Sequence, residues 1–168
     1  MEKLLQELNK FLGKASLATY AGASEALDPS KPDFVARFPG FKEYEYREGK
    51  FYYRDSYAGF FISAGQEAVL YNGQPVWSSQ YGGGMEEKYQ EDEKFAHDTF
   101  AFLKKALSAG EKQTSFQPRG PKKFIEGDWG YLCKWNGSIT KFSGNEEIRY
   151  KDNLVFTHKF FCGLLKWK

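Results

Sequence analysis

An internal repeat is the sequence feature that most constrains how this chain can fold. Residues 65–81 align without gaps on residues 144–160, and both copies begin with a glycine, an amide residue and a glutamate. The same alignment places Tyr52 on Tyr131, and the dipeptide Glu48-Gly49 matches Glu126-Gly127 after a slip of one residue. The chain therefore reads as two units, about 1–84 and 85–168, each a helix, a loop and a four-stranded meander. Two similar hairpins without a duplication are the alternative.

The two helices are predicted from apolar residues that recur at helical spacing. Over residues 3–15 these are Leu4, Leu5, Leu8, Phe11, Leu12 and Ala15. Over residues 92–109 they are Ala96, Thr99, Phe100, Leu103, Ala106 and Leu107, widened by Phe95 and Phe102. Gly110 is expected just after the second helix. The segments 22–39 and 110–121 are rich in glycine and proline and should be irregular.

The remaining segments alternate in the way β-strands do, and aromatic residues, at 18% of the chain, favour a pleated sheet. Turns are predicted at Glu48-Gly49, Asn72-Gly73, Glu126-Gly127, Asn136-Gly137 and Asp152-Asn153. Each half alone would bury little surface, so we expect one domain over residues 1–168. The predicted class is α+β, with the two repeats forming one large curved antiparallel sheet and both helices on one face.

Strand alternation also predicts where the polar side chains point. Glu67 shares a face with Val69, and Glu146 shares the matching face with Ile148. The candidate ligand-binding residues on these inward faces are Tyr53, Asp55, Tyr57, Glu67, Trp77, Glu146 and His158. Aromatic walls with a few convergent polar groups are typical of a small-molecule site, and paired carboxylates could also perform acid–base chemistry. The alternative is structural: each glutamate would accept hydrogen bonds from turn N–H groups or a Tyr hydroxyl, and its repetition favours this role.

Composition and motifs argue against several other classes of function. The net charge of +2 is too small for a nucleic-acid surface, and the basic cluster 119–123 is expected to be a solvated loop. Residues 82–84 are three glycines without the spacing of a phosphate loop and are expected to be a flexible exit from the first meander. Ser63 lacks a nucleophile-elbow context, so no catalytic residue is assigned.

No metal or cofactor is expected, because His97 and His158 lack metal-ligand spacing and the two cysteines fit no zinc pattern. Cys133 and Cys162 should be free thiols. No apolar run is long enough to cross a membrane, and no signal peptide is recognised. The expected location is the cytoplasm.

The chain resembles a known family in several short motifs. The first half carries Ala-Thr-Tyr-Ala-Gly at 18–22, Tyr46, Gly49, Tyr53, Asp55, Tyr57, Gly59, Gly-Gln-Glu-Ala-Val at 65–69, Gly73, Pro-Val-Trp at 75–77 and Tyr81. The second half continues through Gly120-Pro121, Gly127, Gly144, Glu146 and Gly163. These residues are similar to a bacterial and archaeal family of domains of unknown function, found alone or behind XRE-type helix-turn-helix regulators. The resemblance implies an association with transcription regulators and transfers no catalytic residue.

The function expected from the sequence is a non-catalytic sensor or accessory module that binds a small aromatic or apolar ligand. One alternative is a protein-interaction or oligomerisation module, with a protein partner or a homodimer. Another is an enzyme that uses the inward carboxylates. Phe51, Tyr53 and Tyr57 around Asp55 have no full counterpart in the second half, and this patch is where a site is expected.

Overall fold

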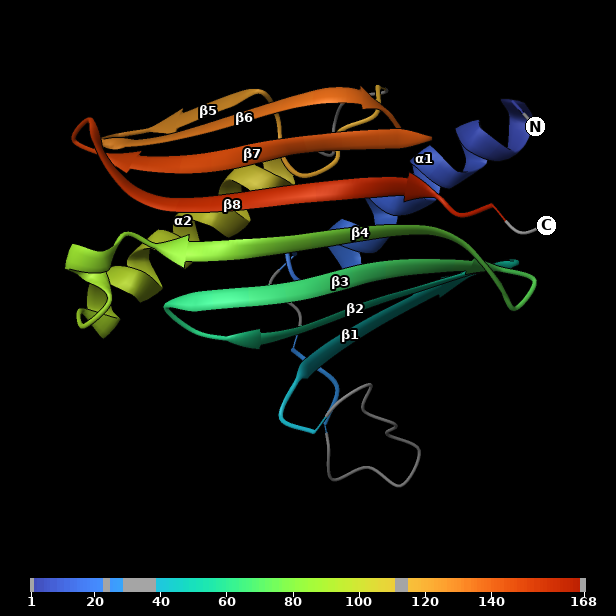
Figure 1. Ribbon diagram of the computed structural model, residues 1–168, viewed down its shortest axis with the longest axis horizontal. Helices are drawn as coiled ribbons and strands as arrows, with labels where there is room; N and C mark the ends of the chain where they lie inside the picture. The colour runs from blue at the N-terminus through green and yellow to red at the C-terminus, as the bar shows by residue number, and fades with distance from the viewer. Residues whose placement is uncertain (1, 23–24, 29–38, 111–114, 167–168) are drawn as a thin grey trace.

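The structure is a computed structural model that describes residues 2–22, 25–28, 39–110 and 115–166 of the 168-residue chain. Its elements in chain order are α1 (Glu2–Ala18), β1 (Lys42–Glu48), β2 (Phe51–Gly59), β3 (Ile62–Tyr71), β4 (Gln74–Met85), the 3-10 turn η1 (Glu87–Tyr89), α2 (Glu93–Gly110), β5 (Lys123–Glu126), β6 (Trp129–Ser138), β7 (Lys141–Tyr150) and β8 (Asn153–Leu164). The predicted α+β class, with two helices and an antiparallel sheet, is confirmed (Figure 1).

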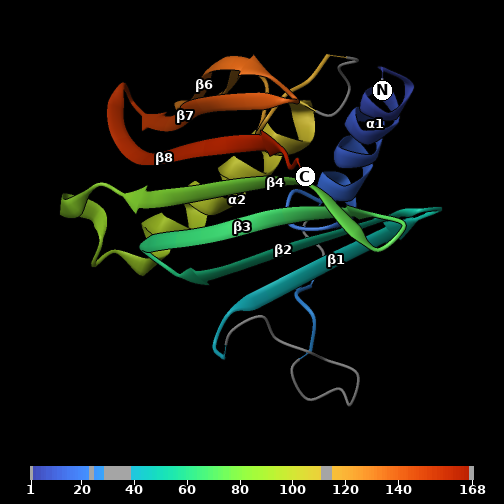
Figure 2. The ribbon, with the colours of Figure 1, turned by 45° about the vertical axis from the view of Figure 1, so that its right-hand side comes forward.

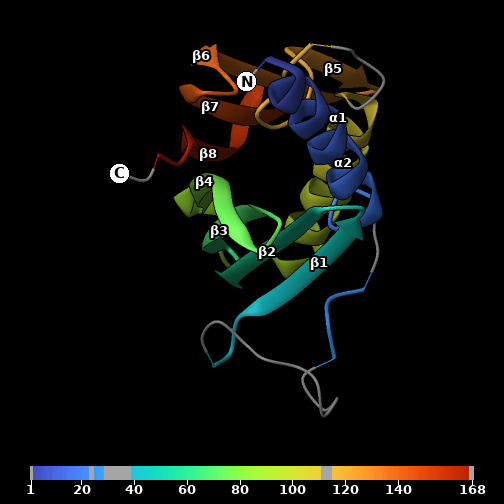
Figure 3. The same ribbon diagram turned by 90° about the vertical axis from the view of Figure 1, so that its right-hand side faces the viewer.

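One eight-stranded sheet runs in the order β1-β2-β3-β4-β8-β7-β6-β5. Each half of the chain contributes a meander, and the two meanders meet through their last strands, β4 and β8. The sheet is strongly curved, and both helices lie on its concave side (Figures 2 and 3). Helix α1 packs on β1 and β2, whereas α2 packs on β5 and β6. The tandem duplication itself stays a prediction.

The register of the strands corrects one detail of the repeat alignment. Tyr53 lies opposite Val69, and Tyr131 lies opposite Ile148. Val69 and Ile148 occupy matching positions in the repeat, so Tyr53, rather than Tyr52, is the counterpart of Tyr131. The segment from Tyr131 to Ile148 is one residue longer than the segment from Tyr53 to Val69, although the loops between the strands, 60–61 and 139–140, are equally long.

The turns follow the predicted chemistry in part. At Asn72-Gly73 both residues have positive φ, 50° and 78°, as a tight two-residue hairpin requires. The last hairpin turns one residue earlier than predicted, because Lys151 and Asp152 are the residues with positive φ. The turn predicted at Asn136-Gly137 is wrong, since this dipeptide lies inside β6 and the chain turns after Ser138.

Gly82, Gly83 and Gly84 are not a flexible exit, as the sequence suggested. They lie within β4 and are paired on both sides, with β3 and with β8. A Cβ atom added at Gly83 would lie 2.2 Å from the carbonyl oxygen of Thr157, so no side chain fits there. These glycines therefore let the backbones at the centre of the sheet approach closely.

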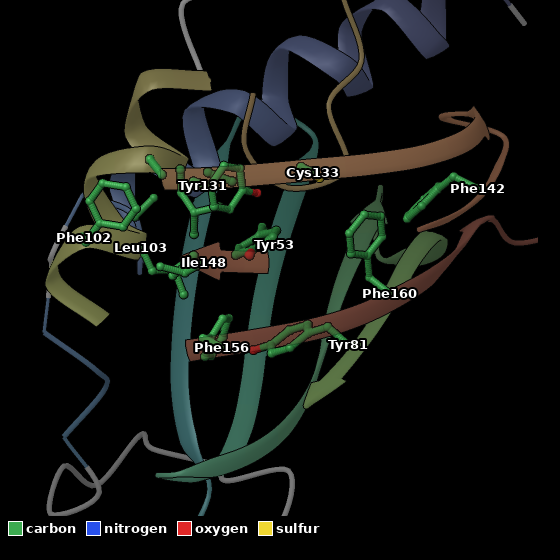
Figure 4. Packing of buried hydrophobic residues seen from close by; sticks show 14 of the residues in the cluster. Tyr53, Tyr81, Phe102, Leu103, Tyr131, Cys133, Phe142, Ile148, Phe156 and Phe160 are labelled. Atoms are coloured by element: carbon green, nitrogen blue, oxygen red, sulfur yellow. The ribbon is translucent and has the colours of Figure 1, made fainter. Parts of the chain in front are cut away.

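The core lies between the concave face of the sheet and the helices. Helix α1 buries Leu8, Phe11 and Ala15, in agreement with the predicted stripe. Helix α2 buries Phe102 more deeply than Phe100, because Phe102 packs against Phe124 and Trp129. Figure 4 shows Phe102 and Leu103 on this helix.

The segments expected to be irregular lie partly outside the described residues, at 23–24, 29–38 and 111–114. Cys133 is buried and Cys162 is half-buried, and both are free thiols. Within the described ranges, neither helix has the length and apolar character needed to cross a membrane.

Candidate functional site

A cavity of about 430 Å³ lies between α1, α2, the concave face of the sheet and the segment 115–119. Its aromatic and aliphatic walls include Tyr20, Tyr57, Trp77, Tyr81, Leu107 and Phe116. Its ionisable lining residues include Asp55, Glu67, Arg119 and His158. The inward faces of the strands place the acidic residues and His158 there, and the loop before β5 places Arg119.

Arg119 is the centre of a buried charge cluster. Its side chain is only 8% exposed, and its Nε donates a hydrogen bond to Glu146 Oε1 at 3.0 Å. Its Nη1 lies 3.6 Å from Glu67 Oε1, and the guanidinium lies 4.7 Å from the centre of the Tyr81 ring. One arginine thus contacts the repeat glutamates of both halves, and it compensates the cost of burying their charge.

A tyrosine on the neighbouring strand binds each repeat glutamate. The Tyr53 hydroxyl donates to Glu67 Oε1 at 3.0 Å, and the Tyr131 hydroxyl donates to Glu146 Oε2 at 2.7 Å. Tyr131 also accepts a hydrogen bond from the N–H of Gly120, which holds the segment carrying Arg119. Figure 4 shows both tyrosines on the concave side of the sheet. The predicted Tyr-hydroxyl partner is therefore present, and it fixes the orientation of both carboxylates.

Asp55 gives the first half a second carboxylate. It lies opposite Glu67 in the β2–β3 ladder and accepts a 2.7 Å hydrogen bond from the Tyr81 hydroxyl. The residue opposite Glu146 in the second half is Cys133. The first half therefore has a carboxylate at the position where the second half has a thiol.

The environment separates the pKa values of the three carboxyl groups. Burial, followed by repulsion from Glu67, raises the pKa of Asp55 to about 7. Burial also raises the pKa of Glu67, against the attraction of Arg119. Burial would raise the pKa of Glu146 too, but Arg119, His158 and Tyr131 outweigh it and hold that pKa at about 2. Glu146 therefore carries a fixed negative charge, whereas the Asp55 carboxyl group is partly protonated near neutral pH and the pKa of Glu67 is shifted in the same direction.

His158 connects the charge cluster to Ser63. Its Nδ1 lies 3.3 Å from Glu146 Oε1, and its Nε2 lies 3.2 Å from Ser63 Oγ. Burial lowers the pKa of His158, so the ring is neutral near pH 7. Ser63 lies on β3 and His158 on β8, the two strands that flank β4, and both are paired with Gly83 of β4. Because Gly83 has no side chain, the side chains of Ser63 and His158 can contact each other across β4.

The family comparison adds a further observation to this geometry. Residues 55–165 match the model of a family described as a domain of unknown function, DUF5680. The chain belongs to the DUF5680 family. Neither a curated protein nor a solved structure matches it. The DUF5680 match contains Asp55, Glu67, Arg119, Glu146 and His158, whereas α1, which forms one wall of the cavity, lies before it.

The predicted site residues of this DUF5680 chain come together in space. Six of the seven line the cavity, namely Tyr53, Asp55, Tyr57, Glu67, Trp77 and His158. The seventh, Glu146, is fully buried beside them and contacts Arg119. Trp77 uses its indole N–H within the fold, because this group donates to the Ile139 carbonyl oxygen at 3.1 Å. That these residues bind a ligand stays a prediction.

Sequence reasoning missed Arg119, Tyr81 and Tyr131. Arg119 was expected in a solvated loop, which is wrong, because its side chain lies under α1 and pairs with two glutamates. One signal could have found it: two inward glutamates need a buried cation, and Arg119 precedes the rigid Gly120-Pro121 pair. Among the described residues, no group of three or more His, Cys, Asp and Glu side chains could hold a metal ion.

Proposed function

We propose that this DUF5680 chain is a non-catalytic module that binds a small ligand in the cavity under α1. The observation that carries the proposal is the 430 Å³ cavity, lined by aromatic side chains and by Asp55, Glu67, Arg119 and His158. Its volume falls within the range of small-molecule sites, and its mixture of apolar walls and few polar groups is typical of them.

The energetics of the charge cluster support a functional role. Replacing a buried ion pair by packed apolar residues is often neutral or stabilising. A chain that needed only stability would have little reason to keep Asp55, Glu67 and Arg119 together beside an open volume. Perturbed carboxyl pKa values in a cavity are a further indication of a functional site.

The resemblance described above suggests the context for this binding. Domains of the similar bacterial and archaeal family stand alone or follow XRE-type helix-turn-helix regions, so we propose a cytoplasmic sensor or accessory role. We also propose that the two halves arose by duplication. In that case one copy of the glutamate, Glu146, became the structural partner of Arg119, while Glu67, with Asp55, stayed at the cavity.

A thermal-shift screen with a cavity-filling variant tests this function. The panel contains neutral, cationic and anionic small aromatic compounds. Ser16 lies on α1 and lines the cavity, so Ser16→Phe should fill it while Ser16→Ala leaves it open. A ligand at about 100 times its Kd stabilises a protein by about 2.7 kcal/mol, which raises the melting temperature by several degrees at this size.

The expected result is a shift in the wild-type protein and in Ser16→Ala that disappears in Ser16→Phe. An equal shift in Ser16→Phe would place the binding elsewhere. If no compound in the whole panel stabilises the wild-type protein, the proposed function is wrong.

A second candidate function is favoured by one observation, the hydrogen-bonded series Ser63–His158–Glu146. Its order is that of a nucleophile, a general base and an orienting acid. However, the Glu146 oxygen that contacts His158 also accepts from Arg119 at 3.0 Å, so its charge is largely neutralised and would stabilise an imidazolium weakly. A fluorophosphonate probe decides the matter: a hydrolase would be labelled at Ser63, with Ser63→Ala as the unlabelled control. We expect no labelling.

A further inference from the structure

We propose that the ligand of this cavity is a protonated amine on an aromatic or apolar body, and that Asp55 and Glu67 bind its ammonium group. This inference rests on the proposed function and adds a chemical class to it. It also changes the expectation from the sequence, which was an aromatic or apolar ligand without a required charge.

The two carboxylates are placed side by side at the cavity. Asp55 and Glu67 are direct cross-strand partners in the β2–β3 ladder, and both line the cavity. Side chains at directly opposite positions of an antiparallel pair have Cβ atoms about 5 Å apart. Two carboxylates at that spacing can contact one ammonium group, which has three donors to offer.

The charges of the cluster do not balance within the fold. Asp55, Glu67 and Glu146 all interact with the single guanidinium of Arg119. That guanidinium donates to Glu146 at 3.0 Å but lies 3.6 Å from Glu67, beyond a good hydrogen bond. Of the two lysines that line the cavity, both on α1, Lys14 pairs with Glu48 and is exposed. Lys10, the other of these lysines, is exposed as well. With all three carboxyl groups ionised, this cluster therefore has three negative charges against the one positive charge of Arg119, which leaves room for a further cation.

The walls of the cavity are aromatic and aliphatic. Tyr20 and Tyr57 both line the cavity, and their rings meet edge to face with centres 6.0 Å apart. Leu103, Leu107 and Phe116 add apolar surface. Aromatic faces attract cations, and aliphatic surface binds an apolar body, so a hydrophobic amine satisfies both parts of the lining.

Binding of an amine should displace a proton from the carboxyl pair. Without a cation beside it, Asp55 has a pKa raised to about 7 by burial and by repulsion from Glu67, and burial raises the pKa of Glu67 as well, so the pair holds part of a proton near neutral pH. An ammonium group adds a positive charge beside the pair, which favours the ionised carboxylates, so the proton leaves. The charged and titratable groups that act on the pair are Tyr20 just after α1, Glu43 and Tyr44 on β1, Tyr53 and Tyr57 on β2, Tyr81 on β4, Arg119 before β5, and Glu146 on β7.

Calorimetry with three indoles tests the inference directly. Tryptamine, tryptophol and indole-3-acetate share an aromatic body and carry an ammonium, a hydroxyl and a carboxylate. We expect tryptamine to bind at least about tenfold more tightly than tryptophol at about pH 8, and indole-3-acetate to bind most weakly. Tryptamine affinity should fall by about tenfold towards pH 6, as the carboxyl pair takes up its proton. Its binding enthalpy near pH 7 should depend on the ionisation enthalpy of the buffer, because a proton is released.

Two charge-neutralising variants test whether Asp55 and Glu67 cause the preference for tryptamine. Asp55→Asn and Glu67→Gln keep the side-chain shapes, so both should bind tryptophol as the wild type does while losing most of the preference for tryptamine. The exposed Glu7 on α1 provides the matched control, because Glu7→Gln removes a carboxylate away from the cavity. Circular dichroism checks that each variant is folded, and the proton release of the wild type needs no variant at all.

The outcomes separate this inference from the proposed function. Equal binding of tryptophol and tryptamine, or stronger binding of indole-3-acetate, overturns the amine inference and leaves the binding cavity in place. Absence of binding by all three also overturns it, and the proposed function then stands or falls with the wider panel and the Ser16→Phe variant. Tryptamine binding that Asp55→Asn and Glu67→Gln leave unchanged would likewise contradict it.

Discussion

At the scale of single residues, the ion pair between Arg119 and Glu146 is the interaction most sensitive to mutation. Glu146→Gln removes the carboxylate nearest the buried guanidinium and should lower the free energy of unfolding by about 3 kcal/mol. Glu67→Gln should cost less, because Glu67 lies farther from Arg119 and its side chain is partly exposed. Urea denaturation of both variants measures the difference. Equal losses of stability would show that Glu146 is not the main group that compensates the buried charge of Arg119.

Asp55 should make the stability of the protein depend on pH in one direction. Its pKa is about 7 in the fold and 3.8 as a free side chain, so the native state holds more protons between these values. The stabilisation is complete below about pH 4 and is lost as the pH rises through about 7.

Asp55→Asn should therefore unfold less readily than the wild type at about pH 8, by a few kcal/mol, and gain little at about pH 4. Melting curves of both proteins across this range measure the difference. Other groups, such as Glu146 and His158, act in both proteins and cancel. A gain that does not grow with pH would contradict the assignment.

At the scale of elements, the glycines of the curved strands are places where another backbone or ring approaches closely. A Cβ at Gly65 on β3 would lie 2.5 Å from the Tyr81 hydroxyl and 2.6 Å from the Tyr57 Cβ. Gly65→Ala should therefore destabilise the protein by about 1–3 kcal/mol, as overpacking does. Gly130 on β6 has no neighbour within 4 Å of such an atom, so Gly130→Ala is the control and should keep the wild-type melting temperature. Equal effects would contradict the packing argument.

The elements also show how far sequence patterns reach. The spacing of apolar residues identified α1, α2 and the inward faces of the strands. It did so because an element with one buried face carries apolar residues at the period of its backbone, helical or extended. The position of Arg119 was missed because an irregular loop has no such period. The contact between Ser63 and His158 was missed because it crosses β4 at Gly83, and this needs the strand order of the whole sheet. The turn at Asn136-Gly137 was misplaced because Gly137, with a φ of 95°, continues its strand.

At the scale of the whole molecule, the two meanders should unfold together as the single domain predicted from the sequence. They share the long β4–β8 ladder, and the Trp77 side chain on β4 binds the carbonyl group of Ile139 in the second half. Urea unfolding followed by tryptophan fluorescence and by far-ultraviolet circular dichroism should give one coincident transition. Two separate midpoints would instead mean that each half folds independently.

The seam between β4 and β8 has a consequence for the protein during its synthesis. β4 can be completed as soon as the first half of the chain has left the ribosome, but its pairing partner β8 is the last strand to emerge. Until then the first meander presents the unpaired edge of a 12-residue strand. Exposed edges of this kind recruit other strands, so the nascent half-chain is the species most at risk of pairing with a second copy. Chaperone protection or slow translation would matter most in the interval before β8 pairs with β4.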